Sequence, residues 1–137
     1  MSEGRATNEI PGVAPARLVW RVDLDVLVVE FRGRRDTPAH MAGCWRAIAD
    51  VAERVGLDKV LAIDLMDDEP FVGEQREAFI RLLSVEIFGR RRWAYVARSI
   101  DRVRAYEATQ LDAQQAGADV RVFSSLAQAE LWVRLPG

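Results

Sequence analysis

Apolar residues follow two different spacings along this chain, and the spacing changes several times between its ends. Residues 17–22 and 26–31 are short apolar runs rich in β-branched residues, and the tight Asp23-Leu24-Asp25 segment separates them. Two such runs around a tight turn predict a β-hairpin. Further strands are predicted at residues 59–65, 93–97 and 120–123. Apolar residues at helical spacing predict helices over residues 38–55, 74–88, 100–116 and 126–132.

Cap residues support the predicted helix boundaries. Thr37 and Pro38 form an N-cap and a first helical residue, and Gly56 ends the same helix. Ser99 and Ser125 are N-cap residues for two later helices. The resulting order, β-β-α-β-α-β-α-β-α, predicts an α/β domain with a mixed five-stranded sheet and four helices.

The length of 137 residues fits one folded domain. Residues 1–15 contain several glycines and prolines and are predicted to be a flexible tail, so that residues 16–137 form the single domain. Half of the residues are hydrophobic and the net charge is -2, which excludes overall disorder and gives no general attraction to nucleic acid or anionic membranes.

The location of the protein is predicted from what its sequence lacks. The apolar runs are too short for stable membrane insertion, and the first residues do not have the pattern of a secretory signal. Cys44 is the one cysteine in the sequence, so an internal disulfide cannot form. We therefore expect a cytoplasmic protein.

The element order and the end of the chain together resemble a known family. The strand over residues 26–31 runs through Gly33 into a helix, and the chain closes with Val120-Arg121-Val122-Phe123 followed by Ala129-Glu130-Leu131-Trp132-Val133. This pattern resembles the SpoIIAA-like branch of the STAS family. The resemblance implies a STAS-like fold and a small, often self-associating regulatory domain that is not an enzyme. That branch has also been compared with lipid-transfer folds of the CRAL-TRIO type, so a small apolar ligand is a second possibility.

One departure from the family affects the expected regulation. The resemblance implies a phosphorylated serine or threonine near the start of the second helix, as in anti-sigma-factor antagonists. Here residues 67–76 contain no hydroxyl side chain. We therefore do not expect a phosphorylation switch at this position.

Four acidic residues, Asp64, Asp67, Asp68 and Glu69, cluster at the carboxyl end of a central strand. Open α/β sheets bind ligands at this edge, and clustered carboxylates suit a divalent cation. Acidic residues before a helix are, however, more often solvated or stabilised by the helix N-terminus. A permanent negative charge in place of a phosphate is a third interpretation. We predict neither a metal nor a cofactor.

Two other groups of residues have a simpler structural interpretation. His40 and Cys44 share a helix face, but the sequence offers no further histidine or cysteine, and Cys44 falls within an apolar stripe. We therefore predict no catalytic residue. Arginines cluster at positions 32, 34 and 35 and at positions 90–92, yet acidic residues elsewhere balance them, so no nucleic-acid partner is predicted.

The second predicted helix has apolar residues around more of its circumference than one buried stripe requires. A homodimer interface, an apolar ligand, or packing within the monomer would each explain the excess, and we predict a homodimer through this helix. We predict a regulatory domain that acts through a protein partner; the alternative is a carrier with a cavity beneath this helix. The candidate surface for a partner or ligand consists of Asp67, Asp68, Glu69, Phe71, Phe79, Leu83 and Ile87.

Overall fold

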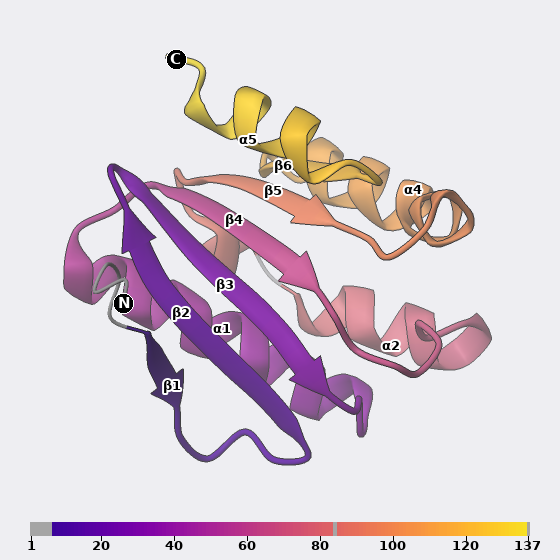
Figure 1. Cartoon of the computed structure of the whole chain (residues 1–137). Coiled ribbons are helices and arrows are strands. Elements are labelled where there is room, and N and C mark those ends of the chain that lie inside the picture. The colour runs from indigo at the N-terminus through magenta and orange to yellow at the C-terminus, as the bar shows by residue number, and fades with distance from the viewer. Residues whose placement is uncertain (1–6, 84, 137) are drawn as a thin grey trace.

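The computed structural model describes residues 7–83 and 85–136, and within them the chain forms one mixed β-sheet with helices on both faces (Figure 1). The sheet has six strands, which lie side by side in the order in which they occur in the sequence. They are β1 (Asn8–Ile10), β2 (Ala16–Asp23), β3 (Val26–Gly33), β4 (Lys59–Asp64), β5 (Arg92–Val96) and β6 (Asp119–Phe123). The pairs β1–β2 and β2–β3 are antiparallel, whereas β3 to β6 are parallel.

The helices divide unequally between the two faces of the sheet. One face is covered by α1 (Pro38–Val55), α2 (Gly73–Leu82), α3 (Val85–Phe88) and α4 (Ile100–Gln115). The other face is covered by α5 (Leu126–Arg134) (Figure 1). This helix packs against β4 to β6, and its residues Ala129 and Val133 are buried there. The main core therefore lies on the side of α1 to α4. Of the helices in the described ranges, none combines the length and the apolar character needed to cross a membrane.

The general α/β architecture and the predicted hairpin are confirmed, but the predicted numbers of strands and helices are wrong. The additional strand, β1, lies within the stretch predicted to be a flexible tail, of which residues 1–6 lie outside the described residues. It pairs with the edge of β2, and Glu9 forms an ion pair with Arg17 (3.0 Å). Three residues are too few to show a periodic pattern, which explains why the sequence did not predict this strand.

The additional helix arises because the segment predicted as one helix over residues 74–88 is broken. Leu83 has an extended backbone and ends α2, and α3 begins at Val85. Phe79 on α2, and Ile87 and Phe88 on α3, are all buried. The wide apolar arc predicted for one straight helix is thus largely absorbed by two helices of the same chain, although Leu82 remains 46% exposed.

The predicted N-caps are confirmed by hydrogen bonds. Thr37 accepts from the backbone N–H of His40, Ser99 from that of Arg102, and Ser125 from that of Gln128. Each bond satisfies a backbone donor that has no partner within its helix.

Gly33 directs the chain from β3 toward the residues that form the candidate site. Its φ angle is +82°, and a Cβ atom at this position would lie only 2.4 Å from the carbonyl oxygen of Pro15. Any larger residue would meet both a steric and a conformational penalty. This close crossing places Arg35 beside the end of β4.

Candidate functional site

Arg35 and Asp64 form a buried ion pair at the carboxyl ends of the parallel strands. Arg35 follows β3 and Asp64 ends β4, and the guanidinium Nη2 lies 2.7 Å from Asp64 Oδ2, with side-chain exposures of 6% and 0%. The hydroxyl of Tyr95, in β5, donates to the same carboxylate oxygen (2.5 Å). Arg35 Nη2 also donates to the hydroxyl of Tyr106, on α4 (2.9 Å). One buried arginine thus connects β4, β5 and α4.

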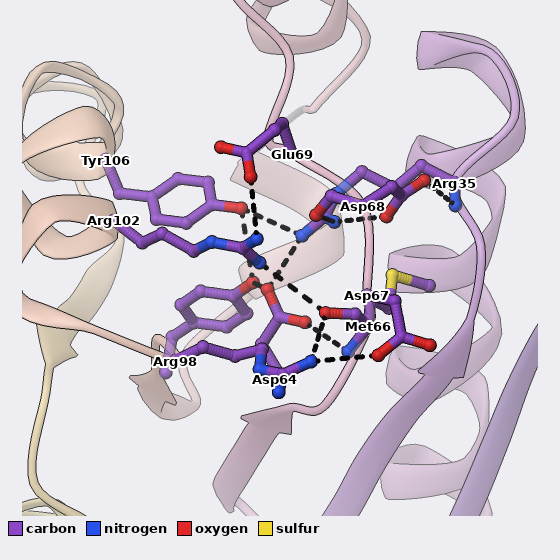
Figure 2. A network of polar contacts seen from close by, with 10 residues as sticks. Arg35, Asp64, Met66, Asp67, Asp68, Glu69, Arg98, Arg102 and Tyr106 are labelled. Carbon is purple, nitrogen blue, oxygen red and sulfur yellow. Dashed lines mark hydrogen bonds and ion pairs between the residues drawn. The ribbon is translucent and has the colours of Figure 1, made fainter.

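The same arginine holds the loop that follows β4 (Figure 2). Its backbone N–H donates to Asp68 Oδ2 (2.7 Å), and its Nη1 donates to Asp68 Oδ1 (2.8 Å) and to the Asp68 carbonyl oxygen (3.1 Å). The backbone N–H of Met66 donates to the remaining oxygen of Asp64 (2.9 Å). These bonds fix the loop against the carboxyl end of β3.

Two arginines from the start of α4 and the turn before it bind the outer side of this loop (Figure 2). Arg98 pairs with Asp67 (3.1 Å), and Arg102 pairs with Glu69 (3.1 Å). Asp67 and Glu69 are 90% and 85% exposed, so these pairs contribute little to stability. Within residues 7–83 and 85–136, no three histidine, cysteine, aspartate or glutamate side chains are arranged to hold a metal ion. The predicted acidic cluster is instead a set of ion pairs.

Burial keeps both tyrosines of the network protonated. Tyr95 is 7% exposed, and its burial, together with the neighbouring Tyr106 and Asp64, raises its pKa well above the ordinary value of 10. Burial likewise raises the pKa of Tyr106, although Arg35 opposes the shift. Both side chains are therefore neutral hydrogen-bonding groups across the physiological pH range.

A pocket of about 70 Å³ lies beside this network and beneath α2. Its walls come from the sheet, from α1 to α4 and from the loop before α2, and most of them are apolar. The lining residues are Phe31, Arg35, Met41, Trp45, Phe71, Arg76, Phe79, Leu83, Phe88, Tyr95, Ala105, Tyr106, Thr109, Gln110, Ala113, Val120 and Val122. The polar network thus forms part of the wall of an otherwise apolar space.

A second pocket of about 110 Å³ adjoins the first. The two share the wall residues Leu83, Phe88, Thr109 and Ala113. Ile80 and Asp112 contribute to the second pocket alone. The incompletely filled space therefore extends along the line between α2 and α4.

The structure brings together only some of the residues predicted to form a partner or ligand surface. Phe71, Phe79 and Leu83 line the first pocket, and Asp68 lies next to them through its bonds to Arg35. Ile87 is 2% exposed, belongs to the core on the side of α1 and lines neither pocket, so its predicted place on a surface is wrong. Asp67 and Glu69 lie on the outer surface of the loop, paired with arginines.

Sequence reasoning missed Arg76, Tyr95 and Tyr106, and it assigned Arg35 only to a cluster of arginines at the end of the hairpin. A usable signal was present: Arg35, Asp64 and Tyr95 all lie at or near the carboxyl ends of predicted strands. Adjacent parallel strands bring such residues to one edge of a sheet. Other arginines of the two predicted basic groups pair with acids: Arg32 with Glu30, Arg91 with Glu53, and Arg92 with Asp119.

His40 and Cys44 do not form a reactive pair. His40 Nε2 lies 2.7 Å from the carbonyl oxygen of Val13, and Cys44 is 1% exposed within the core. Burial raises the pKa of the Cys44 thiol to about 11. The thiolate, which is the nucleophilic form, is therefore scarce near neutral pH.

We expect native protein to react with a disulfide reagent such as DTNB at least about 100-fold more slowly at pH 8 than unfolded protein does, because both burial and the raised pKa suppress the Cys44 thiolate. The reaction is followed by absorbance at 412 nm, with urea-unfolded protein as the control. Equal rates in the two states would contradict this prediction, because they would show that Cys44 is accessible and has an ordinary pKa.

The chain was also compared with known proteins. It matches no protein-family model. A search of curated proteins likewise gave no match.

Proposed function

We propose that this protein is a binding domain for a small, largely apolar molecule, which it holds in the pocket beneath α2. The observation that carries the proposal is the packing of α4. This helix of 16 residues lies over β6, yet its inner residues, Tyr106 among them, are only partly buried and none is fully buried. Protein interiors are normally close-packed, so an inner helix face is usually filled. Here Tyr106, Thr109, Gln110 and Ala113, on one face of α4, border the pocket instead.

The size of the space suits a small ligand. A water molecule needs at least about 10–15 Å³ of such space, so the first pocket, with about 70 Å³, has room for roughly five waters. That room suits a short aliphatic chain, whereas a benzene ring occupies a cavity of about 150 Å³, a volume that the two adjoining pockets reach only together. Leu83 lies in the wall that the two pockets share. A change of its rotamer would extend the first pocket toward the second.

The surroundings of the pocket suit binding without large rearrangement. The ion pair between Arg35 and Asp64 fixes one wall, and Trp45, Phe79 and Tyr95 offer aromatic surface. Ligand sites of this kind combine an apolar lining with a few fixed polar groups. The regulatory role, the resemblance to SpoIIAA-like STAS proteins and the homodimer stay predictions.

The proposal is tested by saturation-transfer NMR with the neutral apolar probes indole and toluene. We expect both to bind the wild-type protein at millimolar concentrations or below. Ala113→Leu, which adds bulk to the wall shared by the two pockets, should weaken binding at least about tenfold, because the side chain removes the space. Ala108→Leu is the matched control, since Ala108 is exposed on the same helix and lines neither pocket.

Two outcomes would overturn the proposal. One is the absence of binding by either probe to the folded wild-type protein. The other is equal binding by wild type, Ala113→Leu and Ala108→Leu, which would place the probes elsewhere on the molecule. Circular dichroism of each variant establishes that it is folded.

A further inference from the structure

Arg76, on α2, is a pocket-lining cation with an unused hydrogen-bond donor. Its side chain is 20% exposed, and Nη1 donates to Glu77 Oε2 (2.8 Å). Its Nη2 is buried and has no hydrogen-bond partner among the described residues. Nη2 forms an ion pair with Asp112 Oδ2 at 3.9 Å, a distance too long for a hydrogen bond. A buried donor without an acceptor is costly, so an acceptor at this position would be stabilising.

Arg35 and the two tyrosines of the pocket wall differ from Arg76 because most of their bonds are made. Arg35 donates to Asp64, Asp68 and Tyr106, and the Tyr95 hydroxyl donates to Asp64. The hydroxyl oxygen of Tyr106 accepts from Arg35, while its nearest other partner, the Tyr95 oxygen, is 3.4 Å away. Its proton is thus available for a second acceptor. The pocket therefore offers donors, and a complementary ligand supplies acceptor oxygens.

We infer that the ligand is a small carboxylic acid whose carboxylate pairs with Arg76 while its apolar tail lies among the aromatic side chains of the pocket. This inference rests on the proposed function and specifies the ligand class of the same site. A carboxylate forms the strongest bonds with a guanidinium because both partners are charged. It needs only the free Nη2, so the bond between Nη1 and Glu77 is retained.

The acids near Arg76 do not prevent the binding of an anion. Glu77 and Asp112 have side-chain exposures of 61% and 51%, so water screens their repulsion. Asp64 and Asp68 are both held by Arg35. The carboxylate of a ligand at Arg76 would therefore meet a desolvated positive group, while the competing negative charges are solvated or paired.

The test compares two ligands of the same shape, phenylacetate and the neutral phenylacetamide, by titration calorimetry at pH 7. We expect phenylacetate to bind wild-type protein at least about tenfold more tightly than phenylacetamide. Arg76→Gln should remove most of this preference by weakening the acid and leaving the amide unchanged. Arg81→Gln removes the same charge from an exposed position of α2 that lines neither pocket, and it should keep the preference.

The outcomes separate this inference from the proposed function. Equal affinity of wild type for the acid and the amide would overturn the carboxylate assignment while leaving a ligand-binding pocket in place. A preference that survives in Arg76→Gln would also overturn it, because another group would then hold the carboxylate. If indole, toluene and both phenylacetyl compounds all fail to bind, the proposed function itself falls.

Discussion

Replacing Arg35 with methionine should lower the free energy of unfolding by about 3–5 kcal/mol. The substitution leaves the Asp64 carboxylate, which is fully buried, without the guanidinium that lies 2.7 Å away. It also removes the bonds that hold Asp68 and the loop after β4. Removing one member of a buried ion pair leaves an uncompensated charge in a low-dielectric interior. Urea unfolding followed by tryptophan fluorescence measures the loss.

Arg32→Met provides the control for this prediction. Arg32 lies close to Arg35 in the sequence and pairs with Glu30 (2.9 Å), but the two side chains are 48% and 28% exposed. We expect its replacement to cost less than about 1 kcal/mol, as is usual for pairs near solvent. A double variant, Arg35→Met with Asp64→Asn, should cost less than the sum of the single variants, because the amide carries no unpaired charge. A loss below about 1 kcal/mol for Arg35→Met would contradict a central role of this pair.

In the folded protein, neither tyrosine should ionise near pH 10, where an exposed tyrosine ordinarily does. The chain contains two tyrosines, and both belong to the network, so absorbance at 295 nm reports on the site alone. Since burial raises the pKa of both, little tyrosinate should form in native protein at pH 10. Urea-unfolded protein should be about half ionised at that pH. Native titration with a midpoint near pH 10 and retained folded structure would contradict the buried network.

The same shift predicts how stability depends on alkaline pH. The folded state holds the Tyr95 proton more tightly than the unfolded state does, so its contribution is complete below about pH 10. Stability then falls as the pH rises toward the folded-state pKa, by up to about 1.4 kcal/mol per pH unit for Tyr95. Urea unfolding between pH 9 and 11.5 measures this loss. The measurement should be made on the Cys44→Ala variant. In the wild-type protein, the raised pKa of the buried Cys44 thiol would also make stability fall with rising pH.

The sequence predicted the elements of the fold better than their ends and interruptions. Periodicity located the helix of α1 between Thr37 and Gly56 because both capping residues act through local hydrogen bonds and backbone geometry. It could not predict the extended backbone of Leu83, since only the tertiary structure determines that Phe79 and Ile87 must both reach the interior. The resulting pair of helices replaces the single helix through which the homodimer was predicted.

The candidate site was predicted only in part, because its remaining contacts also depend on the tertiary structure. Phe71, Phe79 and Leu83 were predicted as ligand contacts from their places on and before α2, and they do line the pocket. The partner of Asp64 was not predicted, because Arg35 is 29 residues away and the pairing depends on the register between β3 and β4. Charge patterns along one chain do not indicate which acid meets which arginine across a sheet.

The most direct test of ligand binding beneath α2 is methyl NMR of the wild-type protein during titration with phenylacetate and indole. The predicted result is that the largest shifts occur at the methyl groups of Met41, Leu83 and Ala113, which come from three different elements around one pocket. Leu131, which is 72% exposed on α5 at the opposite face of the sheet, should not shift. Shifts centred on α5, or no shifts with either compound, would contradict a binding site in this pocket.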